Sequence, residues 1–94
     1  MKYNPTAETI SLFEAILSLS SVDECALFLE DICTIKEIQD LTQRYAVARM
    51  LDAGEKYQEI EEKTGASTAT ISRVNKCLLY GNGGYRTVLK KTKK

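Results

Sequence analysis

The 94-residue chain contains no histidine, no tryptophan and a single proline. Without histidine it lacks the side chain that most often serves as a general acid or base near neutral pH. Its three cysteines, Cys25, Cys33 and Cys77, form no C-x-x-C pair and have no histidine with which to share a metal or a nucleophilic proton transfer. We therefore expect no enzyme, no catalytic residue, no metal site and no cofactor.

Long hydrophobic runs are also missing. No apolar stretch reaches the ~18 residues that a membrane span requires. The sequence does not start with a basic region followed by an apolar one, the pattern of a secretory signal. An odd number of cysteines without such a signal is typical of free thiols in a reducing compartment. These absences predict a cytoplasmic protein that does not contact a membrane.

Strand signals are scarce too, because no stretch alternates apolar and polar residues for long enough. Apolar residues recur at helical spacing over residues 6–19, and two matches to the capping-box pattern, at 21–24 and 34–37, open further helices. The second helix is apolar on so much of its circumference that one neighbour cannot cover it. We predict a single all-α domain whose residues 1–54 form dimerisation helices, since a chain of this length buries a core with difficulty alone.

Residues 57–76, YQEIEEKTGASTATISRVNK, fit a helix-turn-helix. Gly65 stands at the tight turn, where a positive φ favours glycine, and Ser67 is a favourable N-cap for the second helix. The spacing fits an ordinary helical hairpin equally well. The inward positions of the two crossed helices are Ile60, Thr64, Ala66, Ile71 and Val74.

The outward side of the second helix carries small or basic side chains and no acid. Short hydroxyl and methyl groups allow a helix to approach base edges closely, and arginine can bind guanine through two hydrogen bonds. We therefore predict a recognition helix for double-stranded DNA. The candidate DNA-binding residues are Ser67, Thr68, Ala69, Thr70, Ser72, Arg73 and Lys76.

Net charge is absent from the chain as a whole, with 13 basic and 13 acidic residues, but the charges are segregated. Residues 1–34 carry one base and six acids, whereas residues 65–94 carry seven bases and no acid. The acid-free third begins with the predicted recognition helix, which favours a nucleic-acid partner because phosphate neutralisation supplies much of the affinity. Residues 85–94 are predicted to form a short helix and a basic tail, and the tail by itself is equally typical of a solvated end.

Three segments resemble the Trp repressor family, and most closely its YerC/YecD-type branch of small regulators. They are LDAGE at 51–55, EIEEKTGA at 59–66 and ATISR at 69–73, within a similarity that covers about residues 33–78. The resemblance implies an all-α, intertwined helical homodimer. In that arrangement the N-terminal helices of both chains form a common core and two helix-turn-helix heads project outward.

The resemblance also implies a candidate effector pocket, because the Trp repressor holds an amino-acid corepressor between its core and its recognition helix. The contact positions are matched by Thr34, Arg44, Thr70 and Arg73, and Val74 is the fifth residue of the candidate pocket. Val74 departs from the pattern, since tryptophan-responsive members carry a glycine that leaves room for the indole. We therefore predict that tryptophan is not the effector of this protein. The sequence does not identify another small molecule.

These patterns together predict a sequence-specific DNA-binding transcriptional regulator, of the repressor type, that binds a pseudopalindromic operator as a homodimer. The alternative is a helical adaptor that binds another protein. It would use the same apolar helices without needing the acid-free C-terminal third. Binding of duplex DNA at moderate salt separates the two hypotheses.

Overall fold

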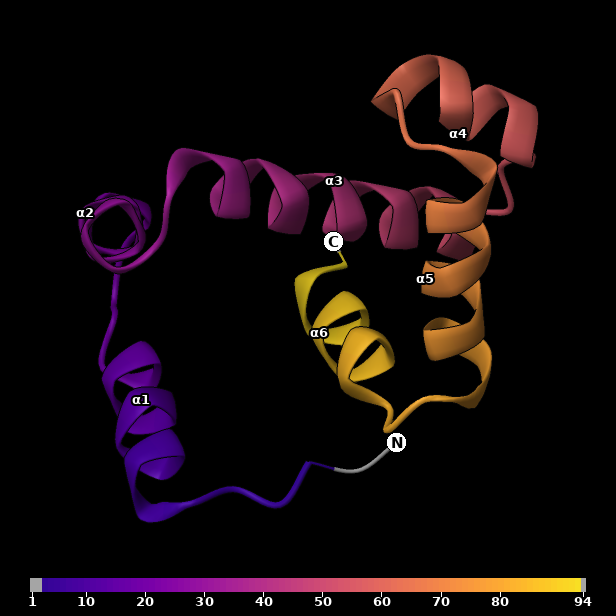
Figure 1. Cartoon of the computed structure of the whole chain (residues 1–94). Helices are drawn as coiled ribbons and strands as arrows, with labels where there is room; N and C mark the ends of the chain where they lie inside the picture. The colour runs from indigo at the N-terminus through magenta and orange to yellow at the C-terminus, as the bar shows by residue number, and fades with distance from the viewer. Residues whose placement is uncertain (1–2, 94) are drawn as a thin grey trace. The chain divides into compact units, whose positions relative to one another are not determined.

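The computed structural model describes residues 3–93, which form six α-helices and no strand (Figure 1). The predicted all-helical fold is confirmed. The chain divides into two compact units, one ending at Ile38 and the other beginning at Gln39. The helices are α1 (Ala7–Leu17), α2 (Val22–Ile32), α3 (Ile35–Asp52), α4 (Tyr57–Thr64), α5 (Thr68–Tyr80) and α6 (Gly84–Thr92).

Local capping bonds start the helices of the N-terminal unit. The Ser21 hydroxyl accepts a hydrogen bond from the Glu24 backbone N–H at 3.1 Å, while the Glu24 carboxylate accepts from the backbone N–H of Ser20 instead of Ser21. At the start of α3 the predicted box is complete. The Glu37 N–H donates to the Thr34 hydroxyl at 3.1 Å, and the Thr34 N–H donates to the Glu37 carboxylate at 2.8 Å. Such reciprocal bonds satisfy two backbone donors that the first turn leaves free.

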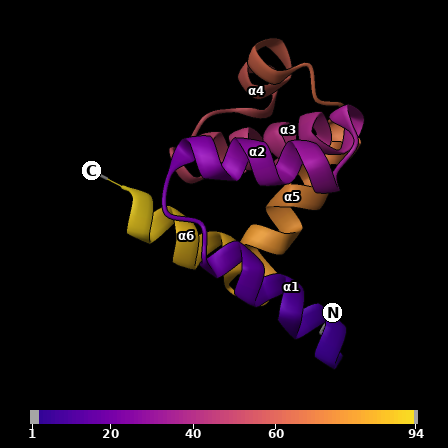
Figure 2. The same cartoon turned by 90° about the vertical axis from the view of Figure 1, so that its left-hand side faces the viewer.

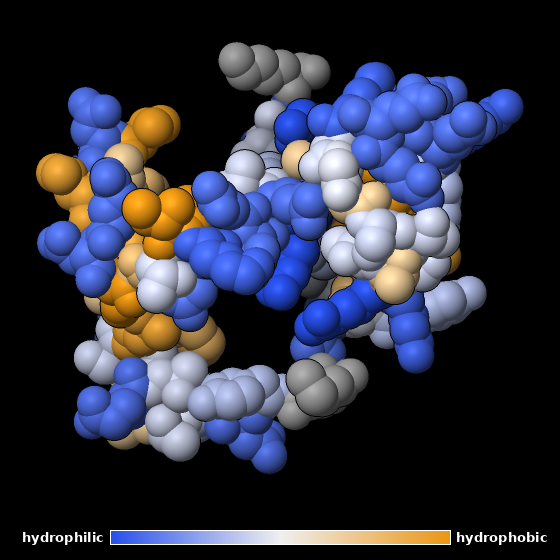
Figure 3. Space-filling view, turned by 45° about the horizontal axis from the view of Figure 1, so that its top comes forward, coloured by the Kyte–Doolittle hydropathy of each residue, from blue (hydrophilic) through white to orange (hydrophobic). Residues whose placement is uncertain are grey.

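Helices α1 and α2, drawn in indigo and purple in Figure 2, bury no residue within the described chain, although their sequences are rich in apolar residues. Leu17 is 83 % exposed and Val22 is 85 % exposed. Hydrophobic side chains gather over this unit in the space-filling view (Figure 3). The large exposed apolar residues of the two helices are Ile10, Leu12, Phe13, Ile16, Leu17, Val22, Leu27 and Ile32.

The C-terminal unit has a hydrophobic core built around α5. Its buried side chains recur at three- and four-residue spacing, which places them on one side of the helix. This side of α5 packs against α4 and α6. The eight buried residues of the core are Val47, Ala48, Ile60, Ala66, Ile71, Val74, Leu78 and Leu89.

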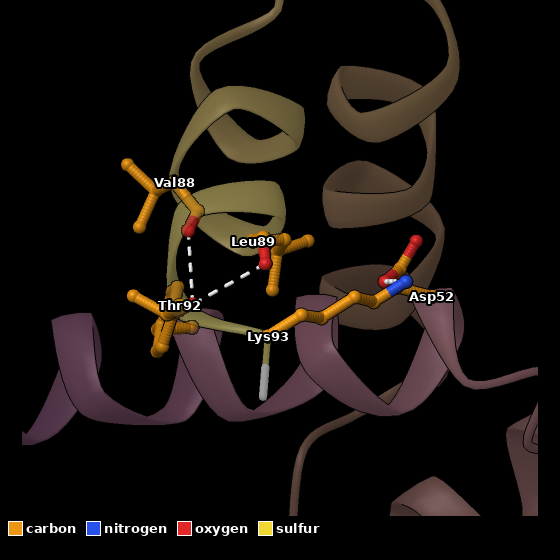
Figure 4. Close-up of polar contacts among 6 residues, drawn as sticks. Asp52, Val88, Leu89, Thr92 and Lys93 are labelled. Carbon is orange, nitrogen blue, oxygen red and sulfur yellow. Dashed lines mark hydrogen bonds and ion pairs between the residues drawn. The ribbon is translucent and has the colours of Figure 1, made fainter.

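Polar contacts fasten the ends of α4 and α6 to α3. The Gln43 side-chain amide donates to the Thr64 carbonyl at 3.1 Å, which satisfies a free acceptor at the end of α4. The Lys93 ammonium lies 3.0 Å from the Asp52 carboxylate (Figure 4), and the hydroxyls of Tyr45 and Thr92 are 3.3 Å apart. The last helix therefore ends against the long one.

The turn between α4 and α5 has the predicted geometry. Gly65 ends α4 with φ +71°, and its N–H donates to the Glu61 carbonyl at 2.9 Å. The Ser67 hydroxyl accepts from the Thr70 N–H at 3.1 Å and so caps α5. The N-cap of α4 is Lys56, which makes no side-chain capping bond, as expected for a residue without an acceptor.

We predict that Gly65→Ala lowers the free energy of unfolding by ~1–2 kcal/mol, because a Cβ is strained in the left-handed conformation. Gly84→Ala is the matched control. Gly84 has ordinary helical φ and open space around its Cα, so the same change should be neutral or stabilise by up to ~1 kcal/mol. Urea titration at one fixed protein concentration measures both. Equal effects of the two changes would contradict the role assigned to the turn.

Candidate nucleic-acid interface

Helix α5 separates a buried side from a solvent side. Ile71, Val74 and Leu78 are each at most 5 % exposed. Of the predicted DNA-binding residues, Ser67, Thr68, Ala69, Ser72, Arg73 and Lys76 are exposed. Thr70 differs, because it is half-buried and its hydroxyl accepts a hydrogen bond from the Ser67 hydroxyl at 3.1 Å. This contact makes Thr70 part of the helix cap.

A carboxylate from α4 lies at the start of α5, which the sequence patterns did not predict. The Thr68 hydroxyl donates a hydrogen bond to the half-buried Glu61 carboxylate. With its hydrogen engaged, Thr68 can only accept a further hydrogen bond. The signal available in the sequence was the acidity of α4, where Glu59, Glu61 and Glu62 follow one another closely.

An ion pair joins α4 to the segment that precedes it. The Lys63 ammonium contacts the Glu55 carboxylate at 2.5 Å. This hydrogen bond, together with the negative charge of Glu55, raises the pKa of Lys63 above its ordinary value of 10.5. The raised pKa means that the pair stabilises the fold at neutral pH and that this contribution is lost as Lys63 deprotonates at higher pH.

A pocket of about 280 Å³ lies in the C-terminal unit among α3, α5 and α6. It contains four of the five predicted effector residues, Arg44, Thr70, Arg73 and Val74. Thr34 does not line it. Thr34 belongs to the N-terminal unit, where its hydroxyl accepts a hydrogen bond from the Glu37 N–H at the start of α3. A single chain therefore assembles most of the expected set but not all of it.

Four further residues line the same pocket and were not predicted: Asp40, Gln43, Cys77 and Tyr85. Asp40 stands four residues before Arg44 and Cys77 four residues after Arg73, so helical spacing could have found both. Tyr85 lies on α6, and only the tertiary packing of that helix brings it to the pocket. Cys77 is exposed.

Val74 belongs to the pocket and to the core at the same time. Its side chain is 3 % exposed and packs in the same cluster as Ile71 and Leu78. The branched side chain thus fills core space that a glycine would leave open. The remaining volume is at the lower end of what binds small molecules.

A wider, mostly apolar groove of about 600 Å³ runs along α6 and the loop before it. It is lined by Tyr45, Cys77, Gly81, Asn82, Gly84, Tyr85 and Val88. Across the described residues we find no cluster of metal-ligating side chains. None of the described helices is both long and apolar enough to cross a membrane.

The C-terminal unit is all-helical, and its acid-free helix α5 packs against the short helix α4. The sequence model of the family described as Trp repressor protein matches residues 7–93. The chain belongs to the Trp repressor family, which is a family of non-enzymatic regulators. Membership in this family supports a role in DNA-binding transcription regulation.

Relatives and solved structures agree with this assignment. The chain is 56 % identical over 86 residues to YerC of Bacillus subtilis (strain 168), a protein described as uncharacterized, and the match spans 92 % of this chain and 83 % of YerC. It is similar, with a TM-score of 0.89 and 56 % identity, to the crystal structure of a TrpR like protein from Eubacterium eligens ATCC 27750. That match covers 92 % of this chain and 89 % of the other.

The crystal structure of a putative Trp repressor from Staphylococcus aureus also has a TM-score of 0.89, with 47 % identity, over 93 % of this chain and 87 % of that one. The predicted TrpR-like fold is thus confirmed.

Proposed function

We propose that this protein is a sequence-specific transcriptional regulator, of the repressor type, that binds a pseudopalindromic DNA operator as a homodimer. One observation carries the proposal: the exposed side of α5 presents hydroxyls, a methyl group and two cations without an acid on the helix. Its opposite side is fixed in a core shared with three other helices. A rigid helix with this surface is suited to the major groove. Three free thiols fit a protein that works in a reducing cytoplasm.

The apolar helices of the N-terminal unit support the homodimer. Isolated apolar side chains on a surface are ordinary, but a contiguous set along two helices marks an interaction site. α1 and α2 bury no residue, and Phe13 and Ile16 are each more than 40 % exposed. The apolar groove along α6 offers further surface to be covered. A second copy that contributes the same surfaces would bury both sets by symmetry.

We expect Phe13→Asp to convert the dimer to monomers, because a charge would be buried in the apolar interface. Ser11→Asp is the matched control, since it adds the same charge to the polar side of α1, which also carries Glu14 and Ser18. Sedimentation velocity measures the assembly state. An unmodified protein that stays a monodisperse monomer at roughly tens of micromolar would refute the dimer.

A dimer with two-fold symmetry would place two copies of α5 against one face of the duplex. Half-sites should then lie about one helical turn, ~34 Å, apart. The runner-up function is a helical adaptor, and the exposed apolar helices by themselves fit it equally well. The acid-free surface of α5 favours DNA, because an adaptor has no need to exclude carboxylates from that helix.

The roles of the residues on α5 can be separated by measuring whether each substitution affects binding to all duplexes or only to particular sequences. Lys76→Ala should weaken binding to specific and random duplexes alike and flatten the salt dependence by ~0.9 for each phosphate that is no longer neutralised. Thr68→Ala and Ser72→Ala should instead change which sequences are preferred. Selection from a random DNA pool, followed by titration of chosen duplexes, measures both effects. If all three changes act equally on every duplex, the reading face has been assigned to the wrong residues.

We further propose that operator binding does not require tryptophan. In a tryptophan-responsive site, the indole must fill a gap before the recognition helix is held correctly. Here Val74 already fills part of that space from within the core. Inserting an indole as well would overpack the site at a cost of ~1–3 kcal/mol, which lowers a micromolar affinity about tenfold or more.

Titration calorimetry with L-tryptophan, paired with operator binding in its presence and absence, checks this proposal. We expect no micromolar heat of binding and an unchanged operator affinity. A micromolar heat coupled to a large gain in operator affinity would show that the helix moves to open the pocket between Arg44 and Arg73.

A further inference from the structure

The first helix of the helix-turn-helix is acidic, which raises the question of where phosphate is neutralised. In helix-turn-helix proteins this helix commonly crosses the DNA backbone. α4 instead carries three glutamates and one lysine, a net charge of −2. Its lysine, Lys63, is paired with Glu55, and Arg73 on α5 borders the pocket. Because neutralised phosphates supply much of the affinity for DNA, a head with an acidic α4 binds more tightly if cations outside α4 and α5 also reach the backbone.

Such cations form a stripe on α6. Arg86, Lys90 and Lys93 follow at four- and three-residue spacing and line one hollow of about 270 Å³ together with Asp52 and Leu89. Asp52 pairs with Lys93. Over residues 3–93, no carboxylate pairs with Arg86 or Lys90, and both are exposed. Like charges four residues apart destabilise a helix by ~0.2–0.5 kcal/mol, so the fold itself gains nothing from this pair.

The stripe is held rigidly relative to the recognition helix. Leu89, which lies between Arg86 and Lys90 in the sequence, is 5 % exposed and lies in the same core as Ile71 and Leu78 of α5. The ion pair from Lys93 to Asp52 fixes the end of the helix (Figure 4). Arg86 and Lys90 therefore have a defined position on the head, unlike charges on a loose tail.

We propose that Arg86 and Lys90 form a second DNA contact, which binds backbone phosphates beside the bases read by α5. This inference rests on the proposed function. The competing occupant is the acidic N-terminal unit of a second copy, since residues 1–34 carry six acids. DNA is favoured because the acidic α4 offers few phosphate contacts. Arg86 and Lys90 would supply such contacts if they bind DNA, but not if they bind a second copy of the chain.

The test compares how strongly binding of a random-sequence duplex depends on salt, because phosphate contacts are independent of sequence. The Arg86→Gln/Lys90→Gln variant removes up to four contacts from a dimer, so its slope of log K against log salt should be flatter by ~3–4. Between about 50 and 200 mM salt the unmodified protein should then lose about a hundredfold more affinity than the variant. The Arg86→Lys/Lys90→Arg variant keeps both charges and should retain the original slope.

Two controls make the outcomes distinct. Lys76→Ala should flatten the slope if the protein binds duplex DNA through α5, and sedimentation reports whether each variant stays assembled. An unchanged slope in the glutamine variant, beside a flattened slope for Lys76→Ala, would overturn the second contact and leave the proposed function standing. Dissociation of the glutamine variant would assign the stripe to a second copy. An unmodified protein that binds no duplex would overturn both proposals.

Discussion

The buried side of α5 is the constraint on which the C-terminal unit depends. Ile71, Val74 and Leu78 are the side chains that α4, α6 and the second half of α3 share. Because protein cores are packed like crystals, the position of this one helix is set by three neighbours simultaneously. The exposed side of α5 is therefore held rigidly as well. A surface so held can present Ser72 and Lys76 to a ligand without a large cost in ordering entropy.

Local signals in the sequence were sufficient for most of the fold. The positive φ of Gly65, the cap at Ser67 and the box at Thr34 follow from chemistry within four residues. The first helix lies within the predicted range 6–19, whereas α5 continues to Tyr80, four residues beyond the predicted end of the helix-turn-helix. Periodicity was sufficient for Ile71 and Val74, two of the three buried residues of α5. These features depend on neighbours in the chain, so the sequence contains all the information that is needed to find them.

The features that sequence reasoning missed all depend on tertiary packing. Glu61 reaches Thr68 only because the turn crosses α4 over the start of α5, and Tyr85 reaches the pocket only because α6 folds back beside α5. Thr34 differs from these residues. It is correctly predicted as a helix cap of the N-terminal unit, but it does not line the pocket of the C-terminal unit. Under the proposed homodimer, a second chain is the remaining source for that position.

The two units obtain stability in different ways, and this links assembly to the proposed activity. The C-terminal unit has its own core, whereas α1 and α2 have capping bonds but no buried residue. Capping contributes ~1 kcal/mol at each helix start, which does not hold an isolated helix of 11 residues in water. In a homodimer the folding of these helices would therefore be coupled to protein concentration. If the proposed homodimer binds a two-fold operator, its two heads must be held at a fixed spacing to engage both half-sites. Disruption of the proposed N-terminal interface would then weaken operator binding even though each α5 remained intact.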